Sequence, residues 1–194
     1  MERRQEWGPV DFPARADDIH PTVNYWTRQG SRRSLVLLLA VAAGVNLLWA
    51  GAVIFRVLVE LPARSTIGPV AFAALSRATD LSRGLVFYPF AGIGSAMLSS
   101  AVWLLARRAR APRSLQRYAG VAGVSTLLVL VVTMRAAPIM FRIGSSPNDP
   151  AALASLADRF ARLTYLRAAL AAVAALALLA ALTACALGVE ERPR

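Results

Sequence analysis

The 194-residue sequence lacks several residue types on which common chemistries depend: it has no lysine, one cysteine and one histidine. Because Cys185 is alone, an intrachain disulfide, a CxxC redox pair and a cysteine-rich zinc cluster are excluded. His20 lies in the N-terminal tail, which excludes a histidine base or haem ligand inside a helical bundle. The HExxH, phosphate-loop and GxSxG motifs are also absent. We therefore expect no metal site and no cofactor.

Aromatic residues are scarce, at 8% of the chain, and charged residues make up only 17%. With so few aromatic residues, a stacking platform for single-stranded nucleic acid is not expected. The formal net charge is +11, but the arginines stand between apolar runs and do not cover a polar surface. The chain is 57% apolar. This composition excludes nucleic acid as a partner and favours the lipid bilayer.

Four apolar runs are free of charged residues and have the length of a membrane-spanning helix, about 20 residues. They cover residues 34–55, 84–106, 118–134 and 168–189. We therefore predict an all-α, polytopic membrane protein whose four transmembrane helices form a bundle. The membrane domain covers residues 34–189. Residues 1–33 form a largely flexible tail, and residues 190–194 form a second, short one.

Arginine density predicts the orientation, because short loops rich in arginine stay in the cytoplasm. The connection between the second and third runs holds five arginines: Arg107, Arg108, Arg110, Arg113 and Arg117. The connections at 56–83 and 135–167 are longer and have a lower density of arginine. We predict that both termini and the arginine loop are cytoplasmic, in a bacterial inner membrane. The cluster is most simply a topology signal, and a lipid-headgroup site is the alternative.

The two longer connections are predicted to carry short interfacial helices. Asp149 can cap a helix that starts at Pro150, and apolar residues then recur at three- and four-residue spacing up to Arg167. This helix lies along the membrane surface or continues into the fourth span. The other connection is expected to break at Pro62 and to resume as a helix after Gly68.

Polar residues within or beside the spans are the candidates for function. Asn46 lies near the middle of the first span, where it makes an interhelical hydrogen bond or contacts a ligand in a cavity. Charged residues gather at the outer span ends, where they pair at the interface or line a site at the bundle mouth. These are Arg56, Glu60, Asp80, Arg83, Arg135, Arg142, Asp158, Arg162 and Arg167.

Three segments give the chain a resemblance to the anthrone-oxygenase-like family of small four-span membrane proteins, also catalogued as a domain of unknown function. They are "GVNLLWAGAVIF" in the first span, "RAAPIMFRI" after the third and "FARLTYLRAAL" before the fourth. Pro138, Phe160, Leu163 and Arg167 match positions of the family pattern, whereas Thr164 stands at its histidine position. The resemblance covers about residues 36–187. It implies cofactor-free oxidation of an apolar polycyclic anthrone, in which Arg167 donates to the substrate oxyanion.

Two classes of function remain open. One is an oxygenase-like enzyme that acts on a hydrophobic small molecule. The other is a non-catalytic scaffold or accessory subunit, with a membrane protein partner or a homo-oligomer as its assembly. A buried cavity favours the enzyme, and a dry, close-packed bundle favours the scaffold. The candidate pocket residues are Arg167, Asn46, Glu60, Asp80, Thr164 and Tyr165.

Overall fold

The computed structural model describes the backbone of residues 21–146 and 148–186, and the side chains from residue 33 onward. Every regular element in this part of the chain is a helix: α1 (Pro21–Phe55), η2 (Arg56–Glu60), α2 (Leu61–Thr79), α3 (Gly84–Arg108), α4 (Arg113–Ser145) and α5 (Pro150–Ala186). The all-helical prediction is confirmed. The predicted tails at 1–20 and 190–194 and the last residues of the fourth predicted span lie outside the described residues.

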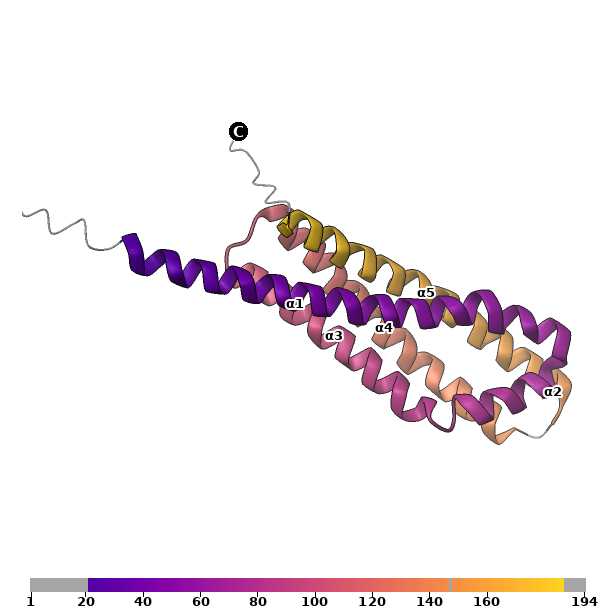
Figure 1. Ribbon diagram of the computed structural model, residues 1–194. Helices are drawn as coiled ribbons and strands as arrows, with labels where there is room; N and C mark the ends of the chain where they lie inside the picture. Colours follow the sequence, from indigo (N-terminus) through magenta and orange to yellow (C-terminus); the bar gives the residue numbers. More distant parts are fainter. Residues whose placement is uncertain (1–20, 147, 187–194) are drawn as a thin grey trace, which may run out of the picture.

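Four long helices form the bundle (Figure 1), and each is long and apolar enough to cross a membrane. Helix α5 packs against α1 and α4, and α3 packs against the same two helices, so the four close into a ring. Large apolar side chains cover the outside: Leu48 is 79% exposed and Phe90 is 82% exposed. Helices that are apolar on every face belong in lipid. The chain is a multi-pass membrane protein.

The helices extend beyond the predicted spans. Helix α1 begins at Pro21 and so includes residues 21–33, which the sequence analysis assigned to a flexible tail. Helix α5 begins at Pro150, as predicted, and the Asp149 side chain accepts a hydrogen bond from Ala151 N at 3.0 Å. Because α5 runs without interruption to Ala186, the predicted interfacial helix and the fourth span are one helix.

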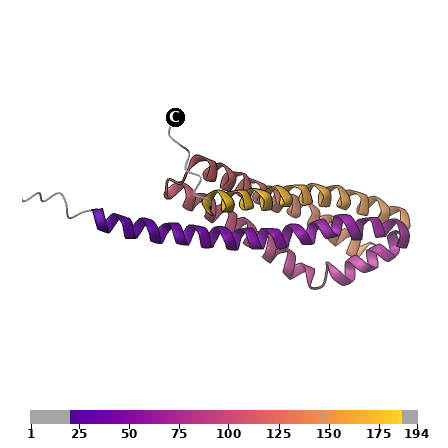
Figure 2. The same cartoon turned by 45° about the horizontal axis from the view of Figure 1, so that its top comes forward.

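Helix α2 folds back against the bundle after the end of α1 (Figures 1 and 2). The expected break at Pro62 is wrong, since Pro62 lies in the first turn of α2, where proline is tolerated. The bend occurs at Gly68, whose φ of 81° and ψ of 164° are readily reached only by glycine. Helix α2 contacts α4 and α5 and covers one end of the bundle.

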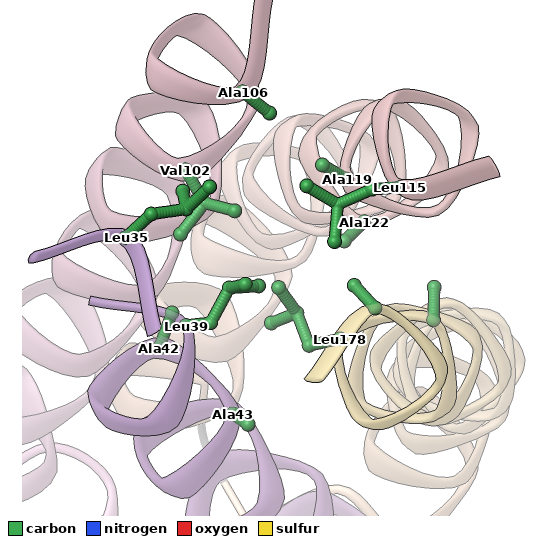
Figure 3. Packing of buried hydrophobic residues seen from close by; sticks show 12 residues of the cluster. Leu35, Leu39, Ala42, Ala43, Val102, Ala106, Leu115, Ala119, Ala122 and Leu178 are labelled. Carbon is green, nitrogen blue, oxygen red and sulfur yellow. The ribbon is translucent and has the colours of Figure 1, made fainter. Parts of the chain in front are cut away.

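Buried side chains differ between the two ends of the bundle. At the end next to the connection between α3 and α4, small alanines and leucines from all four long helices interdigitate (Figure 3). We call this the arginine-loop end. At the opposite end, beside α2, the buried residues are larger and include Phe72, Ile143, Leu153 and Phe160. We call this the pocket end.

Candidate functional site

Arg56 is the centre of a buried polar cluster at the pocket end. It is the first residue of the five-residue π-helical segment η2, and only 4% of it is exposed. Its Nη1 donates to Asp80 Oδ1 at 2.8 Å and to the Tyr88 hydroxyl at 3.1 Å, and its Nη2 donates to Asp80 Oδ2. Two parallel bonds of this kind are the strongest arginine–carboxylate arrangement. Arg56 and Asp80 therefore form a bidentate ion pair shielded from water.

Glu60 gives Arg56 a second, weaker contact. Its Oε2 lies 3.2 Å from Arg56 Nε, one helical turn away, but Nε is not aligned to donate to it. The Glu60 side chain is 38% exposed, compared with 5% for that of Arg56. Irregular π-helical turns are frequent at functional sites. Here η2 contains both buried Arg56 and the partly exposed Glu60 that contacts it.

Asp80 reaches this cluster because α2 folds back. It directly follows the last residue of α2, and its backbone N–H donates to Ser76 O at 2.8 Å. The bend at Gly68 reverses the chain between Arg56 and Asp80, so that residues 24 positions apart meet. Asp80 is 5% exposed, and both of its carboxylate oxygens accept bonds from Arg56.

An aromatic cluster forms another wall of the site. Tyr88 of α3 packs edge-on against Trp49 of α1, with ring centroids 6.0 Å apart, and against Phe87 at 5.7 Å. The Arg56 guanidinium lies 5.0 Å from the centre of the Phe160 ring and 5.7 Å from that of Tyr88. Cation–π contacts at such distances stabilise a desolvated arginine.

Arg167 of α5 is the second buried arginine, 4% exposed. Its guanidinium lies 5.9 Å from the centre of the Tyr88 ring. Two of its nitrogens, Nε and Nη2, have no hydrogen-bond partner among the described residues. Arg167 also has no carboxylate within ion-pair distance in this part of the chain, because both oxygens of Asp80 are taken by Arg56. A buried cation without a counter-charge is costly unless another group satisfies it.

These side chains surround a pocket of about 290 Å³. Helices α3, α4 and α5, the segment η2 and the turn after α2 contribute its walls. The lining residues are Arg56, Asp80, Leu81, Gly84, Leu85, Tyr88, Pro89, Thr133, Ala136, Ala137, Met140, Phe141, Phe160 and Arg167. Its charged members are two arginines and one aspartate, so the lining carries one excess positive charge. Apolar walls with a few convergent polar groups are typical of small-molecule sites.

The structure brings some of the predicted pocket residues together and separates others. Arg167 and Asp80 line the pocket, while Glu60 lies behind Arg56. Thr164 is fully buried, but its hydroxyl donates back to Phe160 O at 2.9 Å and is not part of the lining. Tyr165 is 52% exposed on the outer face of α5.

Asn46 lies outside the pocket, between α1 and α3. Its Nδ2 donates to Ala42 O at 2.9 Å and to Ser99 Oγ at 3.2 Å, and the residue is 1% exposed. Of the two interpretations from sequence, this geometry corresponds to the interhelical hydrogen bond. Asn46 therefore joins two helices and does not face the pocket.

Sequence reasoning placed Arg56 among the charged residues that pair or line a site at the bundle mouth, but its candidate pocket residues did not include Arg56, Tyr88 or Phe160. Helical spacing indicates that Arg56 faces the bundle interior, since it follows Asn46, Trp49 and Val53 at intervals of three and four residues. Tyr88 lies near the outer end of the second predicted span, where an aromatic residue is ordinary. No local pattern identifies it, because its role comes from contacts with α1 and α5.

The five loop arginines are exposed at the arginine-loop end, at the opposite end of the bundle from the pocket. Arg107 packs its guanidinium 5.4 Å from the centre of the Trp103 ring. Arg110 has a φ of 49°, in the left-handed region that few non-glycine residues adopt. The cluster is thus separate from the pocket, and its assignment as a topology signal stays a prediction.

Among the described residues no group of three His, Cys, Asp or Glu side chains could hold a metal ion. Comparison with protein-family models, with curated proteins and with solved structures finds no match to this chain.

Proposed function

We propose that this membrane protein binds an apolar, planar molecule through an anionic or enolisable oxygen and oxidises it without a cofactor. Arg167 carries the proposal: it is buried, lines the pocket and has two nitrogens without a hydrogen-bond partner among the described residues. A planar, permanently charged guanidinium in a water-poor pocket stabilises a developing oxyanion. The resemblance to the anthrone-oxygenase-like family supplies the reaction type.

The proposed reaction converts an anthrone and O₂ into an anthraquinone and water. A base removes a proton from the ring carbon opposite the carbonyl, and Arg167 holds the enolate oxygen that forms. The carbanion adds O₂ at that carbon and takes up a proton to give a hydroperoxide. Loss of water from the hydroperoxide leaves the second carbonyl. O₂ is thereby reduced, with one oxygen atom in the product and one in water.

Asp80 is the candidate base, since it is the only carboxylate among the lining residues. Thr164, at the position where the resembled family has a histidine, is not suited to this role, because its hydroxyl is bonded within α5. Asp80 would accept the proton while Arg56 keeps its carboxylate in place. Arg56 is then a positioning residue.

The arginine distribution supports a bacterial inner membrane location, with both termini in the cytoplasm and the pocket at the outward end. The Arg-rich connection and the pocket lie at opposite ends of the bundle, so the positive-inside rule places the pocket toward the outer leaflet. A hydrophobic substrate would then reach it from the membrane.

Oxygen consumption by the purified protein tests this function. With an anthrone as substrate, we expect one O₂ consumed for each quinone formed. Arg167→Gln removes the charge and Arg167→Lys removes the planar fork, and both should lower turnover. Arg162→Gln, an exposed arginine on the same helix, is the matched control and should leave turnover unchanged. If the wild-type protein consumes no O₂ with any of a panel of anthrones, the proposed enzymatic function is rejected.

One observation favours the alternative, a non-catalytic scaffold or accessory subunit. Both oxygens of Asp80 are engaged by Arg56, so the only carboxylate of the lining is held in an ion pair. The tight alanine packing at the arginine-loop end also suits a structural bundle. Under this function the protein co-purifies with a membrane partner or a second copy, and Arg167→Gln changes stability alone.

A further inference from the structure

The two unpartnered nitrogens of Arg167 belong to one edge of its guanidinium. The N–H of Nε and one N–H of Nη2 point in nearly the same direction, and a group with two oxygens accepts from both at once. Neither nitrogen has a partner among the described residues, although the side chain is buried.

The other charged groups of the lining, Arg56 and Asp80, are paired with each other. Arg56 directs its two terminal nitrogens at Asp80 and Tyr88, and Asp80 accepts at both oxygens. Arg167 is thus the charged lining residue that has neither a hydrogen bond nor an ion pair among the described residues. Asp80 and Glu60 both contact Arg56, so an anionic ligand would supply the counter-charge that Arg167 lacks.

The apolar part of the lining indicates where the rest of the ligand lies. Three lining residues, Leu85 and Pro89 of α3 and Phe141 of α4, are exposed on the outside of the bundle. Leu85 is 45% exposed and Phe141 is 53% exposed. The pocket thus has a polar, buried end at Arg167 and an apolar rim between α3 and α4. Because the outer faces of these helices are apolar, the rim opens towards lipid.

We propose that the pocket binds a membrane-dissolved amphiphile with a single carboxylate, held by the guanidinium of Arg167, with its apolar body towards the rim. This inference rests on the proposed binding site and names its ligand class. A volume of about 290 Å³ lies at the lower limit of ligand pockets, roughly 300 Å³ and upward. A single chain or a small ring system fits better than a two-chain phospholipid.

Equilibrium binding of radiolabelled dodecanoate tests the proposal. The full chain is placed in nanodiscs of zwitterionic lipid, and empty nanodiscs correct for partition into lipid. We expect saturable binding to one site per chain. Unlabelled dodecanoate should compete, whereas dodecanol, which has the same tail and no charge, should compete at least tenfold less well, as expected for the loss of charged hydrogen bonds. Dodecyl phosphate, which also offers two oxygens, tests whether the site distinguishes a planar anion from a tetrahedral one.

A variant of Arg167 separates the contribution of the planar guanidinium to binding from that of its charge. Arg167→Lys keeps the charge but has no fork, and should weaken dodecanoate binding about tenfold or more, while dodecanol competition changes little. Arg162→Gln is the control and should bind like wild type. Because an Arg167 variant could fail to fold, each is first required to elute as a single species and to unfold cooperatively. If Arg167→Lys does not meet that standard, Leu85→Trp and Phe141→Trp replace it and should slow dodecanoate entry at the rim.

The outcomes distinguish this inference from the proposed oxidation. Saturable dodecanoate binding that Arg167→Lys weakens supports the carboxylate site, whether or not anthrones are oxidised. Equal competition by dodecanol and dodecanoate overturns the carboxylate site, while anthrone turnover would still support the oxygenase. Tighter binding of dodecyl phosphate than of dodecanoate overturns the choice of carboxylate. Binding that Arg167→Lys leaves unchanged overturns the assignment to Arg167.

Discussion

Replacing Asp80 by Asn removes the only carboxylate that bonds to both terminal nitrogens of buried Arg56. The two side chains are 4% and 5% exposed, so the arginine would keep its charge in a water-poor site after losing its partner. Breaking a buried ion pair in this way costs about 3–5 kcal/mol. Glu60 remains 3.2 Å from Arg56 Nε and offsets part of the loss. We therefore expect the free energy of unfolding to fall by about 3 kcal/mol, the lower end of that range.

The exposed ion pair between Arg64 and Asp158 is the matched control. Its atoms are 2.6 Å apart, but the side chains are 27% and 59% exposed. Exposed pairs contribute about 0–1 kcal/mol, so Asp158→Asn should have a small effect. Removing both buried partners, with Arg56→Met and Asp80→Leu together, should recover much of the loss, because the arginine that Asp80→Asn leaves unpaired is removed as well.

Unfolding in mixed micelles, by titration with a denaturing detergent, measures these differences. The reasoning requires Asp80→Asn to cost clearly more than Asp158→Asn, and the double variant to be more stable than Asp80→Asn. If the two single variants lose the same stability, Arg56 is not shielded from water and the buried ion pair does not hold the pocket end together.

Three further results are expected. Asn46→Leu removes an interhelical hydrogen bond and should lower the free energy of unfolding by roughly 0.6–2 kcal/mol in the same titration; no change would mean that the bond is not stabilising. A cysteine at position 111, with Cys185 replaced by Ala, should resist an impermeant thiol reagent added outside intact cells, because the arginine loop is predicted to be cytoplasmic. Gly84→Ala places a Cβ 2.9 Å from the nearest ring carbon of the site tyrosine and should cost about 1–3 kcal/mol. Gly92→Ala in the same helix, where no atom lies within 4 Å of the added Cβ, should be near neutral, and equal losses at the two glycines would contradict the close contact.

Local sequence patterns predicted the parts of the fold that depend on local physics. Charge-free apolar runs predicted the four long helices, and Asp149 with Pro150 predicted the start of α5. The stripe from Leu153 to Arg167 predicted the inward face of that helix, on which Leu153, Phe160 and Arg167 are buried. Each of these signals lies within a few turns of one helix.

The partners within the pocket could not be predicted in the same way. Arg167 is one of the charged residues expected to pair at the interface or to line a site, but the carboxylates Glu60 and Asp80 both contact Arg56 instead. That choice depends on how far α2 folds back after Gly68, and therefore on contacts between α2 and two helices much later in the chain. Helical periodicity shows which face is buried, but not which residue of another helix it meets.

Side-chain size explains why this pocket lies at the end of the bundle beside α2. At the arginine-loop end, alanines such as Ala42, Ala106 and Ala122 let the helices approach closely, and leucines fill the remaining space. At the pocket end, Tyr88 and Arg167 stand between the helices, and their flat, wide groups do not interdigitate as alanines do. Because α2 covers this end, the space they hold open is a pocket bounded by buried charge and not a groove open to water. The residues that keep the helices apart are thus the same ones that give the pocket its chemistry.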